Sequence, residues 1–401
     1  KILDFRMFTS REKWILFVLS AMQFVHMLDF VIMMPLSPQF MSFFNISTAR
    51  FGLLVSAYTF AAGLSSFFGA FYIDRYDRKH LIQYFFAGFI LGTLLCALSP
   101  TYEIFLLARI LSGIFGGLMT ALVMSIIGDV FPPERRGVAT GTVMMAFSLV
   151  TVLGVPAGLL LKDLASWHLP FYVIALIGAL LLPLVDHVLP RLRGHLTGKP
   201  ASVTETLSVI FREPSHWTVF AFTITMVMAS FLIIPYLAPA FIGNAGLPEP
   251  YLKHLYGLGG LATFFSARLI GQASDRYGKL AVFLVVTGIS VVPMVALTQI
   301  GQTSIGILLF FSTLFFIFVS GRMVPGLAMI TGSIAPRYRG SFMSLNSALQ
   351  QVTMGAASFI AGLILVKMPD QSLAHFDIVG YLAVLSTLLC MFFARRLRSV
   401  S

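Results

Sequence analysis

The sequence predicts an all-α integral membrane protein whose twelve transmembrane helices form two pseudo-symmetric six-helix bundles. Its 401 residues are 58% hydrophobic and only 11% charged, with a mean hydropathy of +0.90, and soluble domains do not have such a composition. Apolar runs of membrane-spanning length recur along the whole chain. A short charged string occurs twice at half-length spacing, which indicates that the second half repeats the first.

The expected spans fall into two groups of six, each run about 20 residues long, as a bilayer requires. The first bundle covers 1–189, with spans at 14–36, 51–73, 80–98, 102–128, 138–161 and 169–189. A cytoplasmic linker follows over 190–215, where apolar residues at helical spacing predict a short amphipathic helix on the membrane surface. The second bundle covers 216–401, with spans at 216–242, 252–274, 280–300, 304–330, 341–366 and 375–394.

Two repeated strings locate the duplication. The string Asp-Arg-Tyr begins at Asp74 after the second span and again at Asp275 after the eighth, 201 residues later. Spans four and ten also end in similar strings, in which Gly137 and Gly340 stand 203 residues apart. Two matches at nearly one offset support two related halves, and halves that rock about a shared central site are typical of transporters.

The distribution of positive charge predicts the orientation in the membrane. Lys and Arg outnumber Asp and Glu by 27 to 16, which gives a net charge of +11. The tails and loops on one side hold 20 of these cations, and the other side holds four: Arg50, Lys162, Lys253 and Lys367. By the positive-inside rule both termini are cytoplasmic. The excess charge therefore reflects orientation, and we expect no binding to nucleic acid.

Motifs of enzyme chemistry are absent from the sequence. Cys96 and Cys390 both lie inside apolar runs and are interpreted as small hydrophobic residues. No metal-ligand spacing, phosphate loop or nucleophile elbow is present. The sequence therefore predicts a protein that is not an enzyme, has no cofactor and no metal site, and whose partners are a small-molecule substrate, protons and the lipid bilayer.

Two strings resemble motifs of one transporter family. The string from Gly271 to Lys279 matches the loop signature of the major facilitator superfamily in full, and the first copy departs from it at Ala70 and Asp77. The fourth span carries Arg109-x-x-Ser-Gly-x-x-Gly-Gly, which is similar to the family's fourth-span motif. The resemblance implies the twelve-helix major facilitator fold and a monomer.

Two further strings narrow this resemblance. The fifth span carries Gly154-Val-Pro-Ala-Gly158, with Pro156 at its centre, and resembles the antiporter signature as it occurs in sugar-efflux (arabinose-efflux-like) permeases. Asp29 lies ahead of Pro35 in a string similar to the first-span motif of drug:proton antiporters. The chain thus resembles the twelve-span drug:proton antiporter and sugar-efflux branches of the family.

The resemblance also implies gating roles at the cytoplasmic helix ends. Asp74 would contact a helix of the other half and close the inner face, since a carboxylate is stabilised at a helix N-terminus. The other expected gating residues are Arg75, Arg78, Asp129, Asp275 and Arg276. The alternative is that the basic residues only determine topology.

The fifth-span string is expected to form a tight helix interface. Small residues such as Gly154 and Gly158 let helices approach closely, and Pro156 bends its helix. We expect this interface to lie against span eight and to limit leakage of protons. The alternative is that Gly and Pro are simply common in membrane helices.

Asp29 is the only acid deep within an expected span, which makes it a candidate functional residue by default. His26 lies on the same helical face, and Gln23 and Met33 extend that stripe. Asp29, His26 and Arg109 are therefore the candidate proton-coupling residues. The alternatives for Asp29 are binding of a cationic substrate and a static pair with Arg109 that holds spans one and four together.

Polar residues within other spans are candidates for a substrate cavity, because polar side chains in lipid are costly. Arg322 in span ten has no counterpart in the first half, and it indicates either an anionic or carbonyl-bearing ligand or bonds to backbone carbonyls. Tyr236, Asn346 and Gln350 are expected to face the cavity, as are Gln23 and Met33.

Together these features predict a proton-coupled exporter of small organic molecules, such as drugs or sugars, in a bacterial-type inner membrane. A uniporter or importer, or a lipid or lysolipid translocator, on the same fold remains the alternative. A membrane receptor or scaffold is disfavoured because the loops are short, and an intramembrane enzyme because no nucleophile–base pair lies within the spans.

Overall fold

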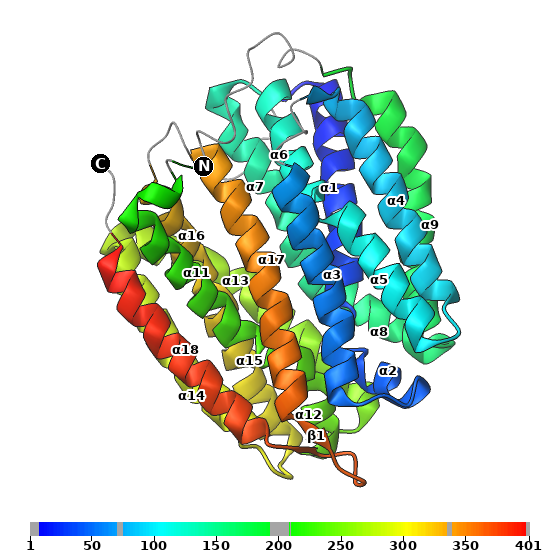
Figure 1. Ribbon diagram of the computed structural model, residues 1–401, viewed down its shortest axis with the longest axis vertical. Helices are drawn as coiled ribbons and strands as arrows, with labels where there is room; N and C mark the ends of the chain where they lie inside the picture. Colours follow the sequence, from blue (N-terminus) through cyan, green and yellow to red (C-terminus); the bar gives the residue numbers. More distant parts are fainter. Residues whose placement is uncertain (1–7, 70–74, 193–207, 209, 335–338, 398–401) are drawn as a thin grey trace.

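The computed structural model describes residues 8–69, 75–192, 208, 210–334 and 339–397, and its helices form two side-by-side bundles (Figure 1). The N-terminal bundle begins at α1 and ends at α9. Its elements are α1 (Ser10–Val31), α2 (Ser37–Phe43), α3 (Thr48–Gly69), α4 (Arg78–Leu98), α5 (Tyr102–Gly116), α6 (Met119–Val130), α7 (Pro133–Leu149), the π-helix η3 (Val150–Gly154), α8 (Val155–Leu164) and α9 (His168–Val188).

The C-terminal bundle contains a small hairpin in addition to its helices. Its elements are α11 (Pro214–Phe231), η5 (Ile234–Tyr236), α12 (Leu237–Gly243), η6 (Glu249–Tyr251), α13 (Leu252–Tyr277), α14 (Lys279–Thr298), α15 (Ile305–Gly321), α16 (Met323–Gly332), α17 (Arg339–Ile364), β1 (Val366–Lys367), β2 (Leu373–Ala374) and α18 (Phe376–Arg396). The strands are antiparallel, with Val366 opposite Ala374. Most of the expected linker helix within 190–215 lies outside the described residues, and the domain boundaries stay a prediction.

The predicted all-α membrane fold is confirmed. Eleven helices or helix pairs of the described chain are long and apolar enough to cross a membrane. The expected span 252–274 is the twelfth, and it forms α13, a continuous helix of 26 residues. At about 1.5 Å per residue such a helix is long enough to span a bilayer. Polar residues such as Lys253, Arg268 and Gln272 make it less apolar than the other spans.

Several spans are interrupted rather than continuous, which the sequence did not predict in detail. α5 gives way to α6 near Gly117, and α15 gives way to α16 at Arg322. The fifth span contains the π-helix η3 directly before Pro156. Proline has no N–H to donate to the preceding turn, and its ring displaces that turn, so a local change of helix type is the expected consequence.

The two copies of the charged loop use different turn chemistry. Gly278 separates α13 from α14 with a φ of +93°, a conformation that favours glycine. Asp77 occupies the matching place in the first copy with a φ of −59°, and its side chain accepts a hydrogen bond from the N–H of Lys79 at 3.0 Å. Asp77 therefore caps α4 at the place where the second copy has glycine.

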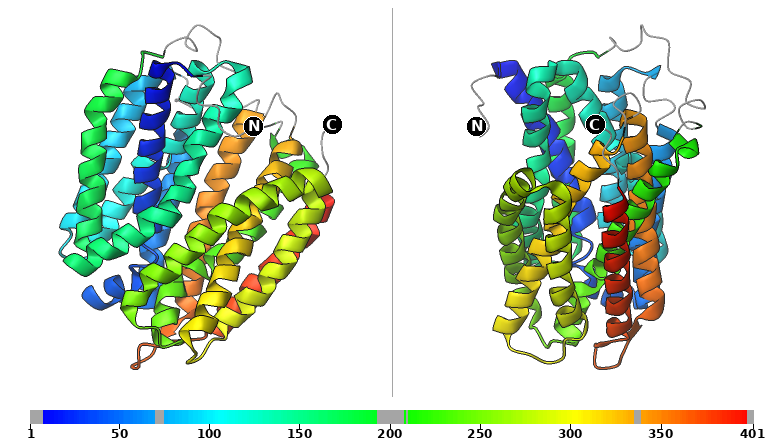
Figure 2. Two further views of the ribbon diagram at one scale, coloured as in Figure 1. Left: turned by 180° about the vertical axis from the view of Figure 1, so that it is seen from behind. Right: turned by 90° about the vertical axis from the view of Figure 1, so that its left-hand side faces the viewer.

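The two bundles, which Figure 2 shows from two further sides, contact one another closely along α3 and α17 (Figure 1). A Cβ atom built on Gly52 would lie 2.8 Å from the carbonyl oxygen of Ser358, and one on Gly355 would lie 2.5 Å from Oγ1 of Thr59. The missing side chains thus allow the helix backbones to approach, as in other membrane helix pairs. A second line of contact joins η3 and α8 to α13.

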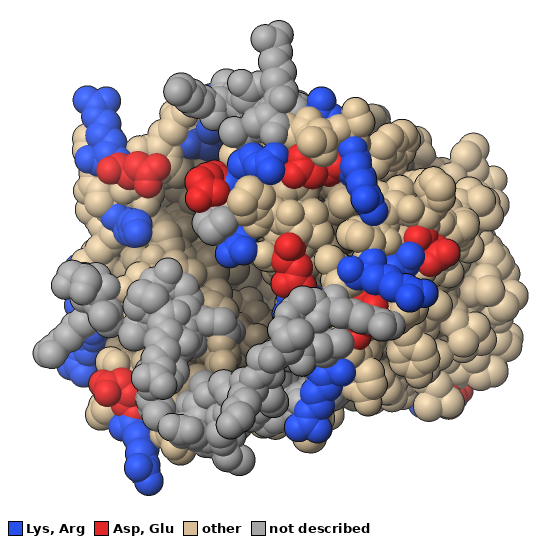
Figure 3. Space-filling model, turned by 90° about the horizontal axis from the view of Figure 1, so that it is seen from above, with Lys and Arg blue, Asp and Glu red and all other residues tan. Residues whose placement is uncertain are grey.

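α1 begins and α18 ends at the same end of the molecule, which we call the terminal end (Figure 1). The opposite end, with α2, β1 and β2, is the distal end. Viewed onto the terminal end, the surface carries many Lys and Arg side chains around a recess (Figure 3). This charge distribution agrees with the expected cytoplasmic face, although the orientation itself stays a prediction.

Candidate functional site

A buried ion pair joins α1 to α5. Arg109 donates from Nη1 to Oδ2 of Asp29 at 2.7 Å, and both side chains have no solvent exposure. Oδ1 of Asp29 accepts a hydrogen bond from Thr93 on α4 at 3.0 Å. Both carboxylate oxygens therefore have donors, and three helices of one bundle meet at a single acid. The pairing of Asp29 with Arg109, which the sequence analysis kept as an alternative, is thus present in the structure, and a proton-coupling role for Asp29 stays a prediction.

Aromatic and imidazole groups complete this cluster. The Arg109 guanidinium lies 4.4 Å from the centre of the Tyr58 ring, a cation–π contact. The hydroxyl of Tyr58 is 3.0 Å from Nε2 of His26, and the His26 ring packs edge-on against Phe89. His26 thus belongs to the same network as Asp29, through Tyr58 and Arg109, although no hydrogen bond joins it directly to the carboxylate.

The cluster has unused hydrogen-bonding capacity. Among the described residues, Nε and Nη2 of Arg109, Nδ1 of His26 and Oγ of Ser112 are buried without a partner. Unpaired polar atoms are costly inside a membrane protein. The cluster therefore keeps buried donors beside the Asp29–Arg109 pair whose hydrogen bonds are not made within the described chain.

Gln23 and Met33, the other stripe residues on the first span, are packed in the protein interior. Gln23 is fully buried and donates to Oγ1 of Thr120 on α6 at 2.8 Å. Met33 is 1% exposed and belongs to the hydrophobic core. Neither lines the cavity described below, so their contact with a substrate stays a prediction.

Arg322 is fully buried at the junction of α15 and α16 and is held by neutral oxygens. It donates from Nη2 to Oγ of Ser230 at 2.8 Å and to the carbonyl of Met226 at 3.2 Å, and from Nη1 to Thr387 at 3.5 Å. No acid forms an ion pair with it within the described chain. Of the two interpretations of Arg322, the bond to a backbone carbonyl is observed, and a ligand role stays a prediction.

The remaining cavity candidates of the second half have separate positions. Tyr236 is fully buried between the bundles and donates to backbone carbonyls. Asn346 is fully buried and accepts a hydrogen bond from Thr223 at 2.8 Å, between α17 and α11. Gln350 is half-buried on α17. None of the three is part of the cavity wall described below.

The gating candidates are only partly brought together. Arg78 pairs with Asp129 at 2.8 Å and donates to the carbonyl of Ser125 at 2.9 Å, which ties α4 to α6 inside the N-terminal bundle. Asp74 lies outside the described residues. The other three, Arg75, Asp275 and Arg276, are exposed at the terminal end. A gating role for these residues stays a prediction.

The fifth-span glycines face a different helix from the one expected. A Cβ on Gly154 would lie 2.9 Å from Leu28, and one on Gly158 would lie 2.5 Å from Ile32, so both glycines pack against the first span. Pro156 does lie toward span eight, since a Cβ built on Gly257 would lie 3.5 Å from Cγ of Pro156. The interface with α13 is instead closest at Gly260, where a Cβ would lie 2.4 Å from the Thr151 carbonyl.

A charge cluster that joins the bundles at the distal end was not predicted. Lys162 pairs with Asp163 at 2.8 Å and also with Glu249, and Lys253 pairs with Asp163 at 2.9 Å. Gln39 donates to Glu249 as well. We call these five residues the distal charge cluster. Lys162 and Lys253 are two of the four cations that the sequence analysis assigned to this side. Lys162 is next to Asp163 in the sequence, and Lys253 follows Glu249 by one helical turn. This spacing was the sequence signal that could have predicted the cluster.

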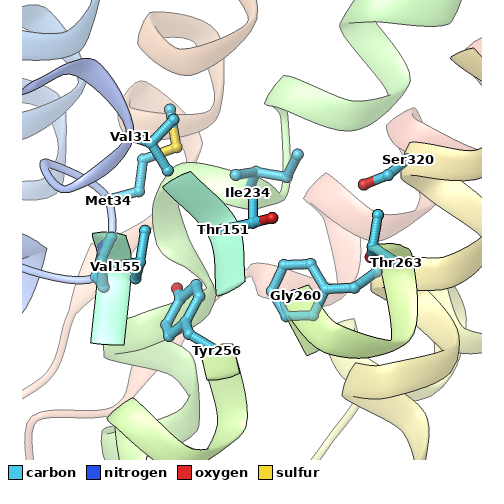
Figure 4. Close-up of a pocket in the computed structure, with 11 residues that line it drawn as sticks. Val31, Met34, Thr151, Val155, Ile234, Tyr256, Gly260, Thr263 and Ser320 are labelled. Atoms are coloured by element: carbon cyan, nitrogen blue, oxygen red, sulfur yellow. The ribbon is translucent and has the colours of Figure 1, made fainter. Parts of the chain in front are cut away.

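A cavity of about 70 Å³ lies between the two bundles (Figure 4). Its walls come from the end of the first span, from the fifth span and from η5, α13 and α15. The described residues that line it are Val31, Met34, Pro35, Thr151, Val155, Ile234, Tyr256, Gly260, Thr263, Phe316 and Ser320. None of them carries a charged side chain, and Pro35 is the one among them that the sequence analysis named by number, as part of the first-span string.

Two helical bundles in contact along paired helices, with a cavity between them and a buried ion pair inside one of them, are typical of a class of membrane transporters. Comparison with known proteins gives the family. The sequence model described as "Major Facilitator Superfamily" matches residues 19–358. The chain belongs to this superfamily, whose members carry small-molecule substrates across membranes and are not enzymes.

Similar proteins occur in several bacteria. The chain is 23% identical over 374 residues to the "Uncharacterized MFS-type transporter YbcL" of Bacillus subtilis (strain 168), covering 93% of each chain. It is 24% identical to the "Probable sugar efflux transporter" of Pasteurella multocida (strain Pm70), covering 84% of this chain and 81% of that one. These relatives and the spans place the chain in a bacterial inner membrane as a multi-pass protein.

A solved structure shares the fold. The D-xylose–proton symporter superposes with a TM-score of 0.78 at 16% sequence identity, covering 95% of this chain and 97% of the other. This likeness supports the major facilitator fold that the motifs predicted.

Proposed function

We propose that this protein is a proton-coupled exporter of small organic molecules that works by alternating access. The observation that carries the proposal is the buried pair of Asp29 and Arg109, the one acid–base pair in the interior of the described spans. Ionisable groups at such positions mark proton or ion pathways in transporters. The antiporter-like string in the fifth span and the sugar-efflux names of relatives support export as the direction of transport.

In this proposal a proton arriving from the distal side neutralises Asp29. The neutral carboxyl group holds the Arg109 guanidinium less strongly, because protonation removes the attraction between opposite charges. Arg109 then shifts toward other acceptors, and α1 and α5 move relative to each other. Release of the proton to the terminal side restores the pair.

The energy available is sufficient for export. One proton moving inward across 100 mV releases about 2.3 kcal/mol, and each pH unit adds about 1.4 kcal/mol. Together these support a solute gradient of roughly a hundredfold or more.

The test uses proteoliposomes with a trapped pH dye and a panel of sugars, cationic drugs, amphiphiles and organic anions. We expect one compound class to trigger proton release, and Asp29→Asn to abolish uphill transport while leaving exchange of substrate detectable. Asp186→Asn is the matched control, because Asp186 is an exposed carboxylate near the terminal end. Full proton-driven export by Asp29→Asn would refute the proposal and favour the static pair.

A uniporter or importer is the second candidate, since the solved neighbour is a symporter. The same assay distinguishes these candidates from an exporter. Binding or exchange of a compound without proton movement, in both the native protein and Asp29→Asn, would favour uniport. Proton uptake together with substrate would favour import. A lipid translocator would move labelled lipid between leaflets in the same vesicles.

A further inference from the structure

The interior of the C-terminal bundle contains a positive charge that has no negative partner within the described chain. Arg322 has no solvent exposure, and a guanidinium keeps its charge at physiological pH. Its hydrogen-bond acceptors are all neutral oxygens, from Met226 and Ser230 on α11 and from Thr387 on α18. Its Nε atom is buried without any partner in the described structure. Neutral acceptors satisfy N–H groups, but they leave the charge itself uncompensated.

The repeat within the chain indicates what is missing beside this arginine. The two copies of the loop signature are offset by 201 residues, and the same offset leads from Asp29 in the first bundle to Ser230 in the second. Asp29 accepts a hydrogen bond from Arg109 at 2.7 Å. Ser230 accepts one from Arg322 at 2.8 Å, and both arginines are fully buried. The second bundle thus has a neutral serine at the position where the first has the compensating carboxylate.

Other acids of the described C-terminal bundle lie away from its interior. They are at helix ends and in loops, with side chains that are exposed or partly exposed: Glu213, Glu249, Asp275, Asp370 and Asp377. Asp29 in the other bundle is already paired with Arg109. A buried charge without a counter-charge is costly, and most of all within a membrane. An ion from solution is therefore the expected source of the compensating charge.

We propose that a small monovalent anion, such as chloride, binds beside Nε of Arg322 inside the C-terminal bundle as its counter-ion. A carboxylate pairs best with two parallel N–H groups. Since Nη2 of Arg322 already donates to Ser230 and Met226, the remaining Nε–H favours a small ion over an organic acid. This site is separate from the cavity between the bundles, whose described lining includes neither Arg322 nor its partners.

The test is the melting temperature of the purified protein in lipid nanodiscs, with sodium chloride replacing sodium gluconate at constant ionic strength. A ligand that binds the folded state stabilises it in a saturable way. We expect a rise of about 4 °C when chloride reaches a hundredfold excess over its dissociation constant. Bromide should substitute for chloride, and Arg322→Gln should abolish the rise.

Ser230→Asp supplies an internal carboxylate at the atom to which Arg322 already donates. We expect this variant in gluconate to melt near the temperature of the native protein in chloride, and added chloride to change it little. Arg268→Gln is the matched control, because Arg268 is an exposed arginine on α13; it should keep the full response to chloride. Equilibrium dialysis with radioactive chloride on the native protein and Arg322→Gln gives a second measurement, which does not require Ser230→Asp to fold.

Three outcomes would overturn the inference. They are a native melting temperature that is the same in chloride and gluconate, no saturable binding of radioactive chloride, and an equal chloride response in Arg322→Gln. Stabilisation of the native protein by acetate but not by chloride would also overturn it. Since neither measurement involves a substrate or a proton gradient, these outcomes are independent of the Asp29→Asn transport result.

Discussion

The hydroxyl of Tyr236, on the C-terminal bundle, donates to the backbone carbonyl of Thr48 on the N-terminal bundle across 3.2 Å. It also lies 2.8 Å from the carbonyl of Ser358, and Thr48 in turn donates to the carbonyl of Gly362 at 3.0 Å. Ser56 adds a further bond to the carbonyl of Gly355. Among the described residues, the hydrogen bonds between bundles thus lie toward the distal end, and they hold that end closed.

Removing the Tyr236 hydroxyl should loosen the distal end. We expect Tyr236→Phe to shift the population toward a distal-open state by about fivefold, because a neutral hydrogen bond contributes about 1 kcal/mol. Spin labels on cysteines at Ser166 and Gln302, exposed on distal loops of the two bundles, would report the distance. Cys96 and Cys390 are fully buried and should not react. An unchanged distance distribution would contradict the role of Tyr236, and Tyr251→Phe is the control.

Adding a methyl group at Gly52 should separate the same helices. A Cβ there would lie 2.6 Å from Oη of Tyr236 and 2.8 Å from the Ser358 carbonyl, so α3 and α17 must move apart. We expect Gly52→Ala to lower the melting temperature and the transport rate. Gly141→Ala, with nothing within 4 Å of the added atom, should be neutral or slightly stabilising, since alanine favours helix. Equal melting temperatures for the two variants would show that the close approach is unimportant.

The distal charge cluster should tolerate a charge swap better than a single reversal. Asp163→Lys places three cations together, and we expect it to favour the distal-open state in the spin-label measurement. Combining it with Lys253→Asp restores an opposite-charge pair and should recover most of the closed population. Ion pairs that are partly exposed contribute about 1 kcal/mol or less. Each substitution should therefore change the ratio of the distal-closed to the distal-open population by a few-fold. A double variant no better than the single one would argue against a direct pairing.

The Asp29–Arg109 pair should be more sensitive to the loss of one partner than of both. Removing one member of a buried pair costs about 3–5 kcal/mol, because the other charge stays buried and unpaired. We expect Arg109→Met to lower thermal stability in detergent strongly, and Arg109→Met with Asp29→Asn to regain much of the loss. Additive losses in the double variant would indicate that the two side chains act independently.

The sequence predicted the spans well because length and apolarity are local properties. The Asp29–Arg109 contact was one of the alternatives that the sequence left open, since few charged residues lie within spans. Its partners Thr93 and Tyr58 were not, because their positions depend on how each helix is rotated and packed. Gly154 and Gly158 were expected against span eight and pack against the first span for the same reason.

The distal charge cluster contains two lysines and two acids, so its charged side chains sum to zero. Its assembly and separation therefore carry no net charge through the electric field of the membrane. Opening and closing of this cluster would then add no voltage dependence of their own to a transport cycle.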